Sequence, residues 1–235
     1  MVTRIFSRRD LLRVGLAGAA VAAAPAGTLG TAEGAAPVLE TPATEAAAQA
    51  REPLETLSAA EADTLEAMVA RLIPSDSNGP GAAEARAAHY IDRALGGALA
   101  SSRQVYAAGL VAVEHYARTS KGASFIRLSP ADQDAVLTDL ESNAATGFTP
   151  NSGAFFELVR NHTIQGMFCD PYYGGNSNFY GWDLLGYPGV RTVVTAEQQR
   201  VGIELAPNHK SAYDYDMFLK ASTRASSRGG ITDGD

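Results

Sequence analysis

The residues best suited to chemistry lie around one run rich in glycine and aromatic side chains. His162 could act as a general base if the carboxylate of Asp170 oriented its ring. The two residues are eight positions apart across the end of a predicted helix, a spacing that matches no known catalytic pair or metal motif. A histidine that packs or caps on a helix is the simpler interpretation. We therefore predict no catalytic residue in this chain.

Metal and cofactor motifs are missing from the sequence. His89, His115 and His209 have no second histidine four positions away, which argues against a zinc site. Cys169 is the only cysteine, which excludes an internal disulfide, a cysteine-based zinc site and an iron–sulfur cluster. No C-x-x-C-H motif and no dinucleotide-binding glycine fingerprint occurs. We predict that the chain carries no cofactor of its own.

Residues 166–189, G-M-F-C-D-P-Y-Y-G-G-N-S-N-F-Y-G-W-D-L-L-G-Y-P-G, are too irregular for a helix and are predicted to form a shaped loop. Its carboxylate and amide groups, with an aromatic platform, could bind a sugar. The same residue types are common in structural and interface loops, which is the role we favour. The predicted interface or structural residues are Asp170, Tyr172, Tyr173, Gly174, Gly175, Asn176, Trp182 and Tyr187.

The single cysteine of this loop resembles a small buried hydrophobic residue, because it follows a phenylalanine. An unpaired thiol in an exported protein also leaves a disulfide to another subunit open for Cys169.

Helical patterns precede the loop. Helices are predicted over 59–73, 85–95 and about 102–118, then from Pro130 after a Ser129 cap, and from about Ser152 to Met167. No alternating strand pattern competes with them. The predicted fold is all-α: an irregular bundle of about five helices, the long loop, and an extended C-terminal tail.

Length and charge narrow the possible partners. The 235 residues are 46% apolar, enough for a core, and the net charge of −7 argues against nucleic acid or an anionic membrane surface.

The N-terminus has the form of a targeting segment. Arg8 and Arg9 precede a short, weakly apolar run, which is typical of a bacterial twin-arginine (Tat) signal over residues 1–26. An ordinary secretory signal or an uncleaved anchor is the alternative. Residues 27–53 hold almost no large apolar side chain and are predicted to be a disordered linker. We expect a periplasmic or other extracytoplasmic location.

The sequence pattern weakens after residue 190. A short helix is predicted near 195–198, and the end of the chain is predicted to be disordered. The folded domain is therefore assigned to 54–190 and an extended tail, partly for partner docking, to 191–235. The tail residues predicted to dock are Tyr213, Tyr215 and Phe218.

Several motifs together resemble one family. They are L-I-P-S-D, Y-I-D-R-A-L, L-S-P-A-D-Q-D-A-V-L, and G-M-F-C-D-P-Y-Y-G-G-N with G-W-D-L-L-G-Y-P-G. Over about residues 54–190 the chain resembles the small subunit, subunit 3, of gluconate 2-dehydrogenase and related sugar dehydrogenases. The resemblance implies a noncatalytic subunit that binds a large FAD-containing GMC-type dehydrogenase, often with a cytochrome c subunit, and escorts it through Tat export.

Two other functions stay open from the sequence alone. The chain could be a free-standing periplasmic protein that binds or modifies a sugar through residues 170–182. It could also be a structural exported protein held by an uncleaved leader.

Overall fold

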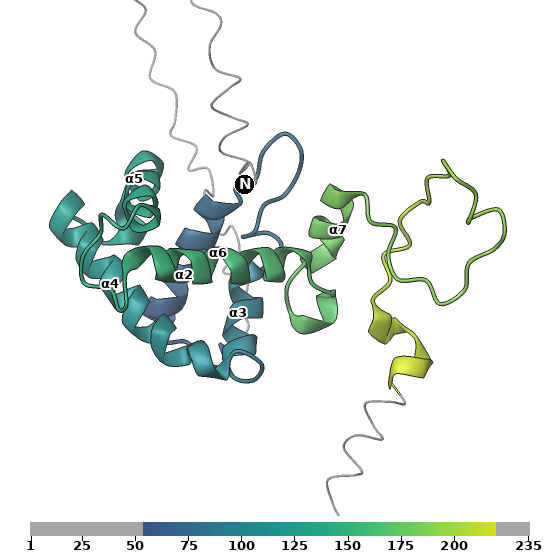
Figure 1. The fold of residues 1–235 in the computed structure, drawn as a ribbon, viewed down its shortest axis with the longest axis horizontal. Helices are drawn as coiled ribbons and strands as arrows, with labels where there is room; N and C mark the ends of the chain where they lie inside the picture. Colours follow the sequence, from purple (N-terminus) through teal and green to yellow (C-terminus); the bar gives the residue numbers. More distant parts are fainter. Residues whose placement is uncertain (1–53, 220–235) are drawn as a thin grey trace, which may run out of the picture. The chain divides into compact units, whose positions relative to one another are not determined.

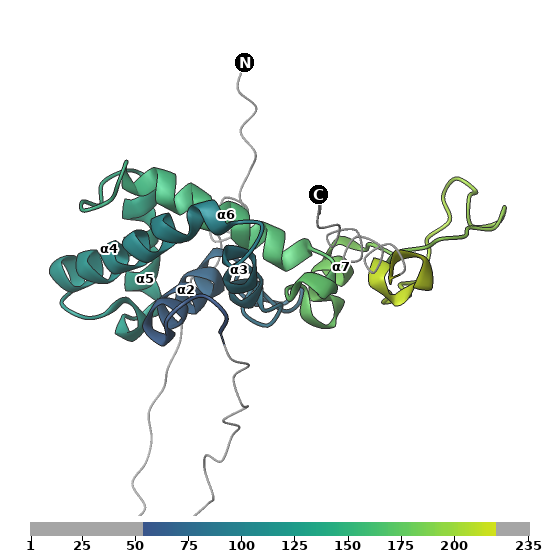
Figure 2. The same ribbon diagram turned by 90° about the horizontal axis from the view of Figure 1, so that it is seen from below.

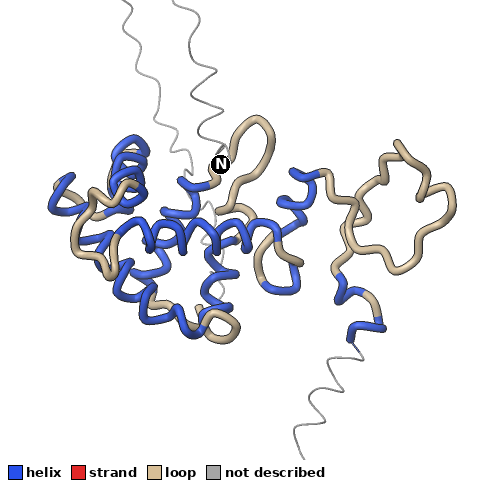
Figure 3. The backbone as a smooth tube through the Cα atoms, in the orientation of Figure 1, coloured by secondary structure: helices blue, strands red, loops and turns tan. Residues whose placement is uncertain are grey.

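The computed structural model describes residues 54–219 and contains helices without a sheet (Figures 1 and 3). The α-helices are α2 (Ala59–Leu72), α3 (Ala87–Leu95), α4 (Arg103–Lys121), α5 (Pro130–Glu141), α6 (Ser152–Phe168) and α7 (Tyr180–Leu185). Within the described range the only β-type pairing is one isolated bridge between Asp76 and Gly79. The all-α prediction is therefore confirmed. The predicted signal peptide, the predicted linker and the end of the predicted tail lie outside the described residues.

The helices begin where local capping residues predict. Ser58 forms a complete capping box with Glu61 at the start of α2. The Ser129 hydroxyl accepts from the Asp132 amide at the start of α5, where Pro130 occupies the first turn. The start of α3 differs by two residues from the prediction, because Arg86 adopts a left-handed conformation with φ of 61°.

Helix α6 forms the centre of the bundle and packs most extensively against α3 and α5 (Figures 1 and 2). Two glycines allow α6 to lie close to α4 and to α3. A side chain on Gly109 of α4 would meet the ring of Phe155, and one on Gly166 would meet the backbone of Ala87. The largest fully buried side chains come from α2 to α6 and the turn before α5: Leu65, Met68, Ile91, Leu95, Tyr106, Leu110, Phe125, Leu137, Leu140 and Met167. Burial of this apolar surface is the main force that stabilises the bundle.

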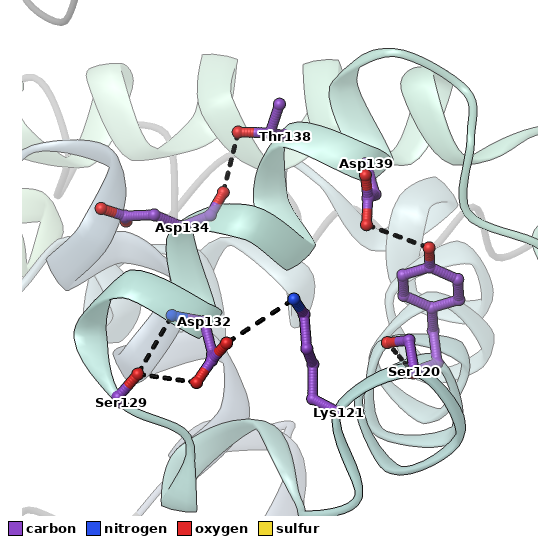
Figure 4. Close-up of polar contacts among 8 residues, drawn as sticks. Ser120, Lys121, Ser129, Asp132, Asp134, Thr138 and Asp139 are labelled. Carbon is purple, nitrogen blue, oxygen red and sulfur yellow. Dashed lines mark hydrogen bonds and ion pairs between the residues drawn. The ribbon is translucent and has the colours of Figure 1, made fainter.

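Polar contacts join α4 to α5 at the surface (Figure 4). Lys121 Nζ lies 3.6 Å from a carboxylate oxygen of Asp132, and the hydroxyl of Tyr116 donates to Asp139 at 3.0 Å. Exposed ion pairs of this kind contribute little to stability, typically about 0–1 kcal/mol. These contacts join α4 to α5 but contribute less to the stability of the bundle than the buried core does.

One buried carboxylate fixes the entry of the chain into the fold. Asp92 of α3 has no exposed surface. Its Oδ2 accepts from the amide of Glu55 at 2.7 Å, and its Oδ1 accepts from the amides of Thr56 and Leu57 at 3.0 and 2.7 Å. Three amides that precede α2 are thus satisfied by one side chain, since no helix carbonyl is available to them.

Two local predictions after α6 were wrong. Residues 166–189 contain the six-residue helix α7, because the side chain of Asn176 accepts from the amide of Gly181 in its first turn. The short helix predicted near 195–198 is only a turn, closed by a bond from the Gln199 amide to the Thr195 carbonyl at 3.2 Å. None of the helices within 54–219 has both the length and the apolar character to cross a membrane.

Asp92→Asn should destabilise the domain. The amide group cannot accept three backbone N–H groups, so at least one buried donor loses its partner. We expect a loss of about 2 kcal/mol in the free energy of unfolding, and a melting temperature lower by roughly 4–8 °C. Denaturant and thermal unfolding measure both quantities. Asp216→Asn, at an exposed position, is the matched control, and an equal loss in both variants would contradict the assignment.

Candidate functional site

The predicted loop is organised by the side chain of Asn176, which is fully buried. Its Nδ2 donates to the carbonyl of Cys169 at 2.8 Å, and its Oδ1 accepts from the amide of Gly181 at 2.8 Å. Its backbone amide donates to the carbonyl of Gly166 at 2.8 Å. Asn176 therefore connects the end of α6, the loop and the start of α7. We call residues 169–187 the motif loop.

Two glycines of the motif loop lie directly against the end of α6. A side chain on Gly175 would collide with the carbonyl of Gly166, and one on Gly181 would collide with the carbonyl of Met167. Any larger residue would push the loop away from the helix.

Aromatic packing completes the inner side of the motif loop. Trp182 is 7% exposed, and its Nε1 donates to the carbonyl of Phe168 at 3.0 Å. Its ring contacts Phe179 and Tyr187, at centroid distances of 5.4 and 4.8 Å. Phe179 has φ of 61°, an unusual conformation for an aromatic residue, and its ring stacks on His209 at 5.1 Å.

Asp170 holds the C-terminal segment against the motif loop. Its Oδ1 accepts from the hydroxyl of Ser211 at 2.6 Å and from the amide of Tyr172 at 3.0 Å. Its Oδ2 accepts from the amide of Ala212 at 2.8 Å. Both carboxylate oxygens are therefore occupied by bonds within the chain.

Three tyrosines extend this contact. The rings of Tyr172 and Tyr213 stack at 3.6 Å, and the hydroxyls of Tyr173 and Tyr213 lie 2.9 Å apart. Tyr172 and Tyr173 remain about half exposed. Tyr213 and Tyr215, predicted to dock on a partner, thus make contacts inside the chain, the latter by donating to the carbonyl of Val190 at 2.8 Å. Phe218 stays exposed, and its role in docking stays a prediction.

A cavity of about 770 Å³ lies beside the motif loop. The residues that line it come from α3, the end of α6 and the loop, and include Tyr90, Arg93, Ala94, Ile164, Phe168, Cys169, Tyr172 and Tyr173. The hydroxyl of Tyr90 donates to Gln165 at 3.3 Å, and Arg93 pairs with Glu55 at 3.4 Å. The cavity is thus mainly apolar, with its polar groups partnered within the chain.

Cys169 is half-buried beside this cavity, and its thiol donates to the carbonyl of Gly166 at 3.5 Å. Burial raises the pKa of the Cys169 thiol to about 11, so the thiol is neutral near pH 7. A neutral thiol is a poor nucleophile and a poor metal ligand. The prediction that Cys169 behaves as a small apolar residue fits this environment.

The structure separates the two residues considered as a catalytic pair. His162 is buried in the bundle, where its Nδ1 lies 3.0 Å from the hydroxyl of Tyr106, whereas Asp170 binds the C-terminal segment. Burial lowers the pKa of His162 and raises that of Tyr106. Among residues 54–219 no cluster of three or more histidine, cysteine or acidic side chains could hold a metal ion.

Sequence reasoning missed the wall that α3 contributes to the site. Tyr90 and Arg93 line the cavity and belong to the Y-I-D-R-A-L motif, but they lie about 80 residues before the motif loop, so the sequence did not indicate that the two motifs lie side by side. It also missed Ser211, whose bond to Asp170 joins the tail to the loop. The Ser211-x-x-Asp214 capping pattern was the available signal for an ordered turn there.

Fold and site together define a small all-α domain with a motif loop fixed by internal bonds and two tyrosines facing outward. The family model described as gluconate 2-dehydrogenase subunit 3 matches residues 59–189, more than half of the chain. The chain therefore belongs to the gluconate 2-dehydrogenase subunit 3 family, as the motifs of the sequence indicated. Comparison with curated proteins gave no match, and comparison with solved structures gave none.

Gly181→Ala should loosen the motif loop. The new methyl group would meet the carbonyl of Met167 and force the loop off α6, at a cost of about 1–3 kcal/mol. Trp182 is the only tryptophan, so a red shift of its fluorescence would report the displacement directly. Gly97→Ala is the control, because nothing lies within 4 Å of the added carbon. Unchanged fluorescence and stability in Gly181→Ala would refute the close approach.

The stability of the domain should depend on His162 in mild acid. The pKa of His162 is lowered in the folded state, so below about pH 6.5 the unfolded chain takes up a proton that the folded chain does not. Stability is therefore lost as the pH falls from about 6.5 toward the folded-state pKa, by up to about 1.4 kcal/mol per pH unit. Unfolding curves at pH 7.5 and 5.5 test this.

His162→Gln should remove this part of the pH dependence, because it removes the group that titrates. His115→Gln, on the exposed face of α4, should leave the dependence as in the wild type. The assignment would be wrong if the wild type and His162→Gln lost equal stability between the two pH values.

Proposed function

We propose that this chain is the noncatalytic small subunit of an exported, FAD-dependent sugar or sugar-acid dehydrogenase complex. The observation that carries the proposal is the family match over 59–189, since the family is described as subunit 3 of gluconate 2-dehydrogenase. The family name indicates an accessory subunit of a multi-subunit complex. In our proposal the partner is a large GMC-type subunit that holds the FAD, and a cytochrome c subunit can complete the complex.

The geometry of the motif loop supports a role in contact more than in catalysis. Asp170 and Asn176 are the polar residues of the loop best suited to bind a ligand. Both side chains make their hydrogen bonds within the chain. His162 is buried against Tyr106. The side chains left facing outward include the rings of Tyr172, Tyr173 and Tyr187, and tyrosine is common in protein interfaces.

The structure gives little support to the sugar-binding alternative, because most of the side chains it requires are buried or already make contacts within the chain. Three aromatic residues could serve as the stacking platform for a sugar. Trp182 is buried and Tyr172 is stacked on Tyr213, whereas Tyr173 stays about half exposed. The carboxylate of Asp170 already accepts three hydrogen bonds within the chain, which leaves it little capacity for a sugar hydroxyl. We therefore do not propose sugar binding as a function of this loop.

The export role rests on the leader. Arg8 and Arg9 form the paired-arginine signal of a pathway that transports folded proteins, and a flavoprotein must fold to retain its FAD. We propose that the small subunit stabilises the large subunit and supplies the signal for both. The leader lies outside the described residues, so sequence alone supports this step.

The test is co-expression of the full chain with a candidate GMC-type flavoprotein subunit from the same genome. We expect the wild type to co-purify with that flavoprotein and its bound flavin, and dehydrogenase activity to reach the extracytoplasmic fraction. With Arg8→Lys and Arg9→Lys together, the complex should still form, but its activity should stay in the cytoplasm.

Two results would contradict these roles separately. A wild-type chain that emerges alone, without flavin absorbance, would end the subunit proposal. Export of the activity at the wild-type level by the double lysine variant would end the escort role alone.

A further inference from the structure

The segment after the family match is a loop whose base is held together. The side-chain amide of Asn208 donates to the carbonyl of Val190 at 2.8 Å. The guanidinium of Arg191 donates to the carbonyl of Ala206 at 2.6 Å. These bonds bring the two ends of residues 191–207 together, and we call this segment the closed loop (yellow-green in Figure 1).

The closed loop exposes β-branched apolar side chains. Val201 is 105% exposed and Val193 81%, while Ile203 and Val194 are 51% and 45% exposed. Val201 and Val193 are open enough to make little apolar contact of their own, so they contribute little to the stability of the loop in the isolated chain. We call these four side chains, Val193, Val194, Val201 and Ile203, the apolar tip of the closed loop. An ordered base that presents exposed apolar side chains is typical of a surface that another protein covers.

Exposed large apolar side chains are concentrated at the C-terminal end of residues 54–219. Nine of the sixteen exposed large apolar residues within 54–219 lie in its last 35 positions. They are Leu185, Tyr187, Val193, Val194, Val201, Ile203, Met217, Phe218 and Leu219. Scattered exposed residues need no explanation, but such a concentration does.

Charge indicates what the closed loop can bind. Arg191 and Arg200 are balanced by Glu197 and Glu204, so the loop is neutral although the whole chain carries −7. A neutral apolar tip suits an apolar groove without strong charge. It does not suit nucleic acid or an anionic membrane, both of which select basic surfaces.

The position of the closed loop bears on specificity. The family match ends at residue 189, and the closed loop begins two residues later. A docking element outside the matched domain can differ between chains that share the domain, and so can distinguish one partner from another.

We propose that the closed loop inserts its apolar tip into an uncharged apolar groove on the large flavoprotein subunit of the same complex, and thereby selects that partner. This inference rests on the proposed function. The occupant is a protein surface because the tip is apolar and neutral, and it is the large subunit because the family describes one subunit of a larger enzyme.

The experiment uses the full chain co-expressed with the flavoprotein subunit that co-purifies with it in the test of the proposed function. The loop variant combines Val193→Ser, Val201→Ser and Ile203→Ser. The control variant makes the same kind of change at Val105, Val111 and Ile126, which are exposed on α4 and the turn after it. We expect flavoprotein recovery to fall at least about tenfold with the loop variant and to stay at the wild-type level with the control.

Stability and salt dependence supply further readouts. Both variants alone should melt close to the wild type, since the altered side chains are exposed. Binding of the wild type should change little between about 0.05 and 0.5 M salt, because the contact is apolar and not ionic.

The possible failures are distinguishable. Full recovery of flavoprotein with the loop variant would overturn this inference alone. A wild-type chain that dimerises by itself through Val193, Val201 and Ile203 would also overturn it, because a second copy would then cover the tip. Recovery of no flavoprotein with the wild type would overturn the proposed function and this inference together.

Discussion

The arrangement of the whole C-terminal half depends on how the buried backbone at the end of α6 finds hydrogen-bond partners. The chain leaves α6 and passes back under it, where water cannot satisfy the carbonyl of Cys169 or the amide of Gly181. Asn176 satisfies both, by donating to the first and accepting from the second. Aspartate could not donate and leucine could do neither, so one side chain fixes the path of the loop.

This constraint reaches the tail through a short series of contacts. Once the loop is fixed, Asp170 and Tyr172 have defined positions. Asp170 binds Ser211 and the amide after it, and Tyr172 stacks on Tyr213. The tail is thus held by the loop, and the loop by the end of α6. A change deep in the motif loop should therefore be felt at residues that lie far from it in the chain.

What could be predicted from the sequence follows the range of the interactions involved. Helix starts were predictable because Ser58 and Ser129 act on amides three residues away. The bonds from Asp92 to residues 55–57 join positions 35 to 37 apart, and the Tyr106–His162 contact joins positions 56 apart. A local sequence pattern could therefore predict neither contact. Helix α7 was missed because it is only six residues long and lies in a glycine-rich stretch, where Asn176 and the packing of Trp182 hold it.

The motif loop and the closed loop differ in how much the fold depends on their side chains. In the motif loop nearly every unusual residue has an internal use, so its sequence has little freedom to change without loss of the fold. The closed loop has the opposite character: Asn208 and Arg191 fix its base, and the apolar side chains of its tip have no internal use. Changes at the tip should therefore leave the stability of the domain intact. In the proposed complex, folding and partner choice would therefore depend on different residues of the chain.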